Sequence, residues 1–391
     1  SKIILLVWFI STGLMITSRV WIYYYNQSTN VEGIRSKENR SKNTVLIIGG
    51  AGYIGSSLIN KLLNENYEVK VLDILFFGKE PIQKFLDNPR FTLIEADFRK
   101  VDDLVMAMQD CKTVIHLGGL VGDPACSVDE YLTTEVNLTS TKIVCQIAKA
   151  AGVSRFIFAS SCSVYGAQEE ILDEESEGSP LSLYAKTKLA SETIIQELSS
   201  DSFTPVILRF ATVFGLSGRT RFDLVVNLLA AKACVDKSMT VFGAEQIRPF
   251  IHVSDAANSI LCAIKAPREE VHNEIFNIGS SDLNYTLLEL ANLIKKQVPD
   301  TDLSIEETND ARNYNVSFQK AKSKLNFETK WTLEEGISQV VDKFNNNEIK
   351  DYSSIIHSNF MHMSENGRDV LGSLEYSGWE KELLEAQFLD K

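Results

Sequence analysis

The sequence TVLIIGGAGYIG, residues 44–55, joins a β-branched apolar run to a glycine-rich turn. A short apolar run of this kind is typical of a buried parallel strand, and a helical pattern of apolar residues follows at 58, 59, 62 and 63. A dinucleotide site requires this context: Gly49 permits a tight turn, Gly52 lets the backbone approach a pyrophosphate, and Gly55 packs helix against strand. The helix N-terminus offers N–H groups and partial positive charge to the phosphates.

A carboxylate follows the second predicted strand, residues 67–72. This residue, Asp73, lies 18 positions beyond Gly55. A carboxylate there accepts hydrogen bonds from a ribose 2′-hydroxyl and repels a 2′-phosphate, so NAD is favoured over NADP. Further strand-like runs alternate with helical stretches at 91–95, 113–117, 155–159 and 206–210. The sequence therefore predicts an α/β fold, a Rossmann-type doubly wound parallel sheet with a smaller C-terminal substrate-binding lobe.

Composition disfavours several classes of protein and site. The 391 residues are 44% hydrophobic and 23% charged, which argues against a disordered or coiled-coil chain. The net charge of −13 disfavours a nucleic-acid partner, because binding phosphates needs a basic face. The six cysteines form no CxxC pair and no metal-ligand spacing, so we expect no metal site and a reducing compartment.

The first 43 residues differ from the rest in charge and hydropathy. Residues 3–16 are almost wholly apolar and residues 20–25 are rich in aromatic side chains. Together they approach the roughly 20 residues of a transmembrane helix, with the basic cluster at 35–42 placing the body on the cytoplasmic side. The alternatives are an extension produced by gene calling, or a signal peptide that lacks a small-residue cleavage site. We expect a cytoplasmic catalytic body, with or without a membrane anchor at residues 3–25.

Two later segments carry candidate catalytic groups. Ser161 closes a predicted strand, and Tyr184 and Lys188 lie one turn apart on one face of a predicted helix. A lysine ammonium and a bound nicotinamide cation both lower the pKa of a nearby phenol. Tyr184 is then a candidate general base for a sugar hydroxyl to which Ser161 also hydrogen-bonds. Taken alone, a tyrosine and a lysine at this spacing are more typical of a solvated helix face.

Six motifs occur in an order that resembles one enzyme family. They are GGAGYIG (49–55), Asp73, Asp97-Phe98, HLGG (116–119), SSCSVYG (160–166) and YAKTK (184–188). Over about residues 44–345 the chain resembles an extended short-chain dehydrogenase/reductase of the NAD-dependent nucleotide-sugar epimerase/dehydratase family, similar to UDP-glucose 4-epimerases. The resemblance implies NAD as cofactor, a nucleotide sugar as substrate, and a homodimer formed through helices at 131–150 and 184–198.

The resemblance also implies roles for individual residues. The catalytic residues would be Ser161, Tyr184 and Lys188, with Lys188 also binding the nicotinamide ribose. The cofactor contacts would be Gly49, Gly52, Tyr53, Ile54, Gly55, Asp73, Asp97, Phe98, Leu117, Gly118, Gly119, Asn137, Lys188 and Phe210. The substrate contacts would be Thr212, Arg221, Asn227, Arg248 and Arg312, although a solvated basic loop is an equal alternative around Arg221. Arg248 begins RPFIHVSD (248–255), whose arginine would grip the substrate diphosphate.

Departures from the family pattern narrow the reaction. Dehydratases carry Asp-Glu after the catalytic hydroxyl residue, whereas this chain has Cys162-Ser163, so elimination of water is disfavoured. Relatives that epimerise at carbons 3 and 5 place a cysteine at the position of Ser163, so Cys162 is expected to be a small strand-end residue. A 4-epimerase-like site remains, although this chain has Arg209-Phe210-Ala211-Thr212 where 4-epimerases often have Arg-Tyr-Phe-Asn, and so lacks an amide that can touch the diphosphate. The alternatives are a reductase or dehydrogenase, and a non-catalytic cofactor-binding scaffold.

The predicted organisation has four parts. The leader ends at 43, the cofactor domain covers 44–212, and the substrate lobe covers 213–345 with a crossing back near 248–263. Residues 346–391 form an acidic tail with no predicted function.

Overall fold

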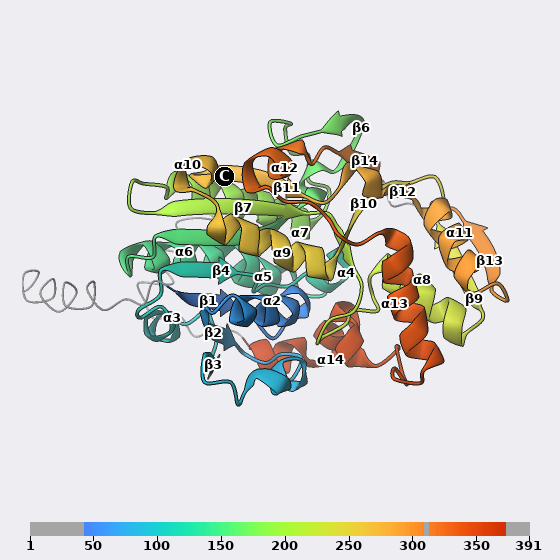
Figure 1. The fold of residues 1–391 in the computed structure, drawn as a ribbon, viewed down its shortest axis with the longest axis horizontal. Helices are drawn as coiled ribbons and strands as arrows, with labels where there is room; N and C mark the ends of the chain where they lie inside the picture. Colours follow the sequence, from blue (N-terminus) through green and yellow to red (C-terminus); the bar gives the residue numbers. More distant parts are fainter. Residues whose placement is uncertain (1–42, 309–312, 373–391) are drawn as a thin grey trace, which may run out of the picture.

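The computed structural model describes residues 43–308 and 313–372. A parallel sheet runs through the body, with helices on both faces (Figure 1). Its strands are β1 (Thr44–Ile48), β2 (Glu68–Asp73), β3 (Phe91–Glu95), β4 (Thr113–His116), β5 (Arg155–Ser161), β7 (Thr204–Phe210) and β11 (Glu274–Ile278).

The order of these strands is β11-β7-β5-β4-β1-β2-β3. The chain moves outward from β1 to β3, then returns to place β4 on the other side of β1, so Ile48 lies opposite both Leu72 and His116. Ligands bind α/β sheets at such a reversal, beyond the carboxyl ends of the strands. The predicted doubly wound α/β fold is confirmed.

Strand β1 shows why this segment lies at the centre of the sheet. All five of its residues are buried, which requires apolar cover on both faces. Val45 and Ile47 belong to a core cluster with α2 and α9, whereas Leu46 and Ile48 belong to a second cluster with α3 and α6. The bounds of these helices are α2 (Tyr53–Asn64), α3 (Val101–Ala107), α6 (Ser140–Ala150) and α9 (Val253–Lys265).

The helix predicted over 131–150 is interrupted. It consists of α5 (Glu130–Thr134), a π-helical turn (Glu135–Thr139) and α6. The side chain of Asn137 lies in the π-helical turn and hydrogen-bonds to the backbone of Leu120. Insertions of this kind are frequent at functional sites. The second helix of the expected dimer face is α7 (Leu183–Glu197); the homodimer itself stays a prediction.

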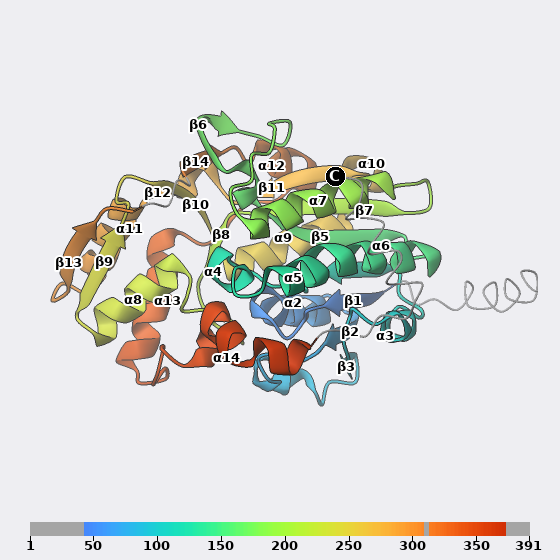
Figure 2. The same cartoon turned by 180° about the vertical axis from the view of Figure 1, so that it is seen from behind.

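A separate hydrophobic cluster, from Phe214 to Val341, forms the core of the lobe that the sequence predicts to bind substrate; that role stays a prediction. Figure 2 shows this lobe beside the main sheet, joined to it through β8 and β10. The chain then returns to the sheet through α9 and β11. The remaining elements are α4 (Asp123–Cys126), β6 (Ala167–Leu172), β8 (Thr212–Phe214), α8 (Val225–Val235), β9 (Ser238–Phe242), β10 (Ile247–His252), α10 (Arg268–Val271), β12 (Asn284–Thr286), α11 (Leu287–Gln297), β13 (Asp302–Glu306), β14 (Asn313–Val316), α12 (Gln319–Leu325) and α13 (Leu333–Asn345).

A last helix, α14 (Asn359–Leu371), folds back along the cofactor domain. Figures 1 and 2 both show it at the edge of the molecule where β2 and β3 lie. Its buried residues Met363 and Leu371 share a hydrophobic cluster with Leu120 and Val136. The described part of the expected acidic tail is therefore docked on the body.

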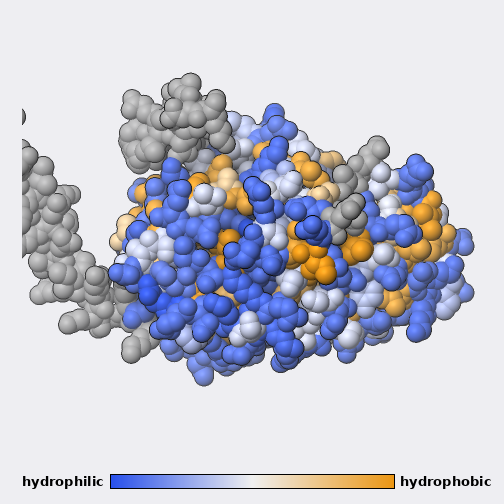
Figure 3. Space-filling view, turned by 90° about the horizontal axis from the view of Figure 1, so that it is seen from above, coloured by the Kyte–Doolittle hydropathy of each residue, from blue (hydrophilic) through white to orange (hydrophobic). Residues whose placement is uncertain are grey.

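The predicted leader and the far C-terminal end lie outside the described residues. Within residues 43–308 and 313–372, no helix combines the length and the hydropathy needed to cross a membrane. Figure 3 shows a mainly hydrophilic face on which apolar residues form separate patches.

Candidate active site

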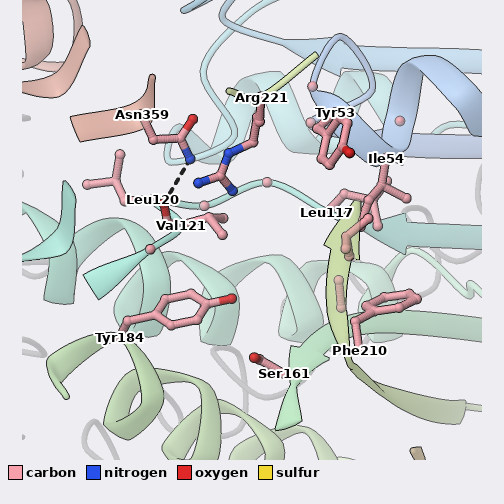
Figure 4. Close-up of a pocket in the computed structure, with 18 of the residues that line it drawn as sticks. Tyr53, Ile54, Leu117, Leu120, Val121, Ser161, Tyr184, Phe210, Arg221 and Asn359 are labelled. Carbon is pink, nitrogen blue, oxygen red and sulfur yellow. Dashed lines mark hydrogen bonds between the residues drawn. The ribbon is translucent and has the colours of Figure 1, made fainter. Parts of the chain in front are cut away.

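A cavity of about 330 Å³ opens where the carboxyl ends of the central strands meet. It contains the ends of β1, β2, β5 and β7 and the loop after β4 (Figure 4). The predicted site residues that line it are Gly49, Gly52, Tyr53, Ile54, Gly55, Asp73, Phe98, Leu117, Gly118, Gly119, Ser161, Tyr184, Lys188, Phe210, Thr212 and Arg221.

The glycine-rich turn allows close backbone contacts, one with the loop after β4 and one between the turn and the start of α2. Gly49 has φ +79°, and a Cβ there would lie 2.6 Å from the backbone nitrogen of Gly118. A Cβ on Gly55 would lie 2.5 Å from the carbonyl oxygen of Gly50. The first turn of an α-helix has N–H groups without intrahelical partners, and Tyr53 and Ile54 from the first turn of α2 line the cavity. This cradle fits the pyrophosphate of a dinucleotide.

Asp73 lies at the end of β2 with its carboxylate fixed by the backbone. Oδ2 accepts a hydrogen bond from the N–H of Ala51 at 2.9 Å, and Oδ1 accepts one from the N–H of Leu75 at 2.8 Å. Burial raises the pKa of Asp73, and these two hydrogen bonds act in the opposite direction. The position fits an acceptor for a ribose hydroxyl.

Two predicted cofactor contacts lie behind the cavity wall. Asn137 is 2% exposed, and its amide accepts from the N–H of Leu120 and donates to the carbonyl of Leu120 at 2.8 and 2.9 Å. Asp97 accepts hydrogen bonds from Arg99 at 2.7–3.1 Å. Neither residue lines the cavity. Asn137 shapes the loop after β4, and the carboxylate of Asp97 is engaged by Arg99.

The three predicted catalytic residues meet on the cavity wall. In Figure 4, the side chains of Tyr184 and Ser161 point toward one another from α7 and the end of β5. Lys188 is 4% exposed, and its Nζ lies 5.9 Å from the centroid of the Tyr184 ring. The same Nζ donates a hydrogen bond to the carbonyl of Ala159 at 2.8 Å.

Burial controls the protonation of this group. It raises the pKa of Tyr184 above its ordinary value, while Arg221 and a hydrogen bond with Ser161 act in the opposite direction. Burial lowers the pKa of Lys188 to about 8. Both shifts follow from the same cause, because removal from water disfavours the charged form of each side chain.

Cys162 does not offer a base to the cavity. The thiol is 1% exposed and contacts the carbonyl oxygen of Arg209 at 3.3 Å. Burial raises the pKa of the Cys162 thiol. The side chain therefore behaves as a small packed residue at the strand end.

The predicted substrate contacts are divided. Thr212 and Arg221 line the cavity, and Arg221 pairs with Asp223 at 2.9 Å. Asn227 is fully buried and donates to the hydroxyl of Tyr53 at 3.2 Å. Arg248 is not among the lining residues and donates to Gln246 at 3.0 Å. The fifth contact, Arg312, lies outside the described residues.

Sequence reasoning missed several residues of the cavity wall. The hydroxyl of Ser163 and Nη2 of Arg219 are buried, and within the described part of the chain neither has a hydrogen-bond partner. Arg219 lies over the Phe77 ring at 3.6 Å, and burial lowers the pKa of its guanidinium to about 9. Asn359 and Leu371 reach the cavity from α14. The Arg-Thr-Arg spacing at 219–221 was a signal for Arg219, whereas the sequence had no local signal for α14.

Comparison with known proteins agrees with this geometry. A family model described as "NAD dependent epimerase/dehydratase family" matches residues 45–279. UDP-glucose 4-epimerase of Bacillus subtilis is 31% identical over 321 residues, which cover 74% of this chain and 94% of that protein. UDP-glucuronic acid decarboxylase 1 of Arabidopsis thaliana is 30% identical over 322 residues, covering 78% of this chain and 71% of that protein.

Solved structures show the same architecture. UDP-glucuronic acid 4-epimerase from Bacillus cereus, in complex with UDP-glucuronic acid and NAD, superposes with a TM-score of 0.71 at 26% identity. The match covers 78% of this chain and 99% of that one. The predicted family and its dependence on NAD are confirmed. The chain thus belongs to the NAD-dependent epimerase/dehydratase family.

Proposed function

We propose that this protein is an NAD-dependent epimerase of a nucleotide-diphosphate sugar, acting through a transient 4-keto sugar. The observation that carries the proposal is the meeting of Tyr184, Ser161 and Lys188 on the wall of the same cavity as the dinucleotide cradle. A hydroxyl placed between Tyr184 and Ser161 would face a hydride acceptor held by the glycine turn.

NAD, when bound, accepts a hydride from a sugar carbon and later returns it. Tyr184 takes the proton of the 4-hydroxyl as general base, and Ser161 holds the same oxygen by a hydrogen bond. After the ketone presents its other face, Tyr184 returns the proton. The substrate is neither oxidised nor reduced overall, and the configuration at carbon 4 is inverted.

The protonation states of Tyr184 and Lys188 indicate that Lys188 stabilises the phenolate of Tyr184. Because burial disfavours the phenolate of Tyr184, a nearby positive charge is needed to stabilise it. Lys188 carries that charge below about pH 8. Above this pH the phenolate of Tyr184 loses the stabilisation that the charge of Lys188 provides.

The substrate diphosphate needs cationic contacts on the lobe side of the cavity. Arg219 and Arg221 lie on this wall, and Asp223 pairs with Arg221. Two guanidinium groups beside one carboxylate attract a diphosphate, and the planar group offers paired N–H donors. This arrangement supports a nucleotide-diphosphate sugar as the substrate.

Elimination of water is not supported by the site. Departure of a hydroxyl as water needs a proton donor beside the catalytic serine. Cys162 is buried against backbone, and Ser163 carries only a neutral hydroxyl. Decarboxylation is the second candidate, because one relative at 30% identity is named a UDP-glucuronic acid decarboxylase. A 4-keto glucuronic acid loses carbon dioxide readily, so both candidates share the first step.

The test incubates the full chain with NAD and a panel of nucleotide sugars that includes UDP-glucose and UDP-glucuronic acid. Products are separated by chromatography with mass detection. A new peak of unchanged mass supports epimerisation, whereas loss of carbon dioxide supports the second candidate. Loss of water, a change of two hydrogens, or no turnover with NAD bound contradicts the proposal.

A pair of variants tests the role of the base. Tyr184→Phe is expected to lower kcat by roughly 10²–10⁴-fold, as removal of general acid–base catalysis does. Tyr131→Phe is the matched control, because Tyr131 is 66% exposed on α5. Equal activity of the two variants would exclude Tyr184 as the base.

A further inference from the structure

We propose that α14 forms the outer wall of the cofactor cavity and retains NAD between turnovers. The inference rests on the proposed function only in taking NAD as the occupant of the cavity. It assigns a role to the C-terminal segment, for which the sequence had predicted none.

The helix reaches the cavity at both of its ends. Its first and last residues, Asn359 and Leu371, both line the cavity. Thirteen residues at the rise of an α-helix extend about 20 Å. The Asn359 end contacts Arg219 and Asp223 on the lobe side, and the Leu371 end shares a hydrophobic cluster against which Ile74, the residue after Asp73, packs.

The Leu371 end is fixed by a buried ion cluster. Arg99, 4% exposed, pairs with Asp97 and Glu135 at 2.7 and 2.9 Å. Its guanidinium also donates to the carbonyl oxygens of Leu371 and Gly372. Arg99 therefore ties the end of α14 to the loop after β3.

The middle of the helix packs on the loop that follows Asp73. The ring of His362 lies against those of Phe76 and Phe77, with centroids 4.5 and 4.9 Å apart. Both phenylalanines line the cavity. Met363, 2% exposed, adds an apolar contact to the same side. By the position of Asp73, this is the side that would hold the adenosine half of the dinucleotide.

The Asn359 end is held by hydrogen bonds to the lobe side and to the loop after β4. Its side chain accepts from Arg219 at 2.6 Å and donates to the carbonyl of Val121 at 2.8 Å (Figure 4 draws the second bond). Its N–H donates to Asp223 at 2.9 Å. The helix is thus fastened at both ends.

The contacts indicate that α14 borders the cavity and does not occupy the place of the cofactor. Of the residues of α14, only Asn359 and Leu371 line the cavity, and the glycine cradle and Asp73 still face it. A reaction that removes and returns the same hydride does not require release of NAD. Slow release therefore does not limit turnover.

The first test measures release of NAD from the full chain. Protein loaded with labelled NAD is mixed with excess unlabelled NAD, and the label retained is followed with time. Met363→Asp places a charge under α14 and is expected to release NAD at least ten-fold faster. Met361→Asp makes the same change on the exposed side of the same helix, where Met361 is 39% exposed, and should release NAD as the wild type does.

Trypsin cleavage at Arg368 reports whether α14 has left the body. A folded Met363→Asp variant that is cleaved there but releases NAD at the wild-type rate would overturn the inference. Slower release in that variant would do the same, because it would make α14 a competitor of the cofactor.

Hydrogen exchange of the unaltered chain decides the question even if Met363→Asp does not fold. Bound NAD is expected to slow amide exchange in residues 359–371 several-fold, and equal exchange with and without NAD would contradict the retaining wall. A wild-type chain that does not bind NAD would refute the proposed function and this inference together. Binding and slow release without sugar turnover would refute only the proposed reaction.

Discussion

Burial of the Lys188 ammonium is expected to lower the free energy of unfolding of the cofactor-free protein. Its ammonium is buried, and its pKa falls from 10.5 to about 8. At 1.36 kcal/mol for each pKa unit, this difference corresponds to about 3 kcal/mol of lost stability at neutral pH. Lys188→Met should remove this penalty and lose about 1 kcal/mol from the hydrogen bond to Ala159. The variant should therefore be more stable than the wild type by roughly 2 kcal/mol at pH 7, and inactive.

The pH dependence of the stability gain shows whether the gain comes from removal of the buried charge or from improved packing. The folded chain releases the proton of Lys188 at lower pH than the unfolded chain, so wild-type stability rises between about pH 8 and 10.5. The advantage of Lys188→Met should shrink by about 2 kcal/mol on going from pH 7 to 9.5. Urea unfolding at both pH values measures it, with Lys186→Met, an exposed lysine of α7, as the control. A variant less stable than wild type at pH 7, or an advantage independent of pH, would refute the reasoning.

Three further predictions follow from the cavity wall. Asp73→Ala should reduce the preference for NAD over NADP, because the carboxylate that repels a 2′-phosphate is gone. Binding titrations with both dinucleotides give the ratio of their dissociation constants, and a ratio equal to that of the wild type would contradict the prediction. The kcat/KM of the wild type should fall as pH rises through about 8, because Lys188 loses its charge; a plateau up to pH 10 would exclude this role. Gly55→Ala should destabilise the fold by about 1–3 kcal/mol through the clash with Gly50, as thermal or urea unfolding would reveal.

The sequence predicted the parts of the site that depend on neighbouring residues in the chain. The turn at 49–55 follows from a buried strand, glycines and a helix start within twelve residues, and the fold it indicated is the one observed. Tyr184 and Lys188 reach one cavity because four residues make about one helical turn. In both cases, local geometry fixes where the side chains point.

Other parts depend on contacts that no local pattern encodes. A buried side-chain amide can hydrogen-bond to a ligand or to the protein backbone, and the sequence does not distinguish the two. In this structure Asn137 accepts a hydrogen bond from the N–H of Leu120, and Asn227 accepts one from the N–H of Gly215. The carboxylate of Asp97 is engaged by Arg99, a residue with no motif of its own. The resemblance to the family implied one helix over 131–150 and gave no indication of the π-helical turn that holds Asn137.

The contact between Arg99 and the end of α14 has a consequence for biosynthesis. The two partners are 272 residues apart in the chain. At a synthesis rate of roughly 5–20 residues per second, Arg99 is synthesised roughly 15–50 s before Leu371. Until α14 is made, the apolar side chains that it covers in the folded protein, among them Leu120 and Val136, lack that cover. Burial of this cluster therefore waits for α14, which follows every other described element in the chain.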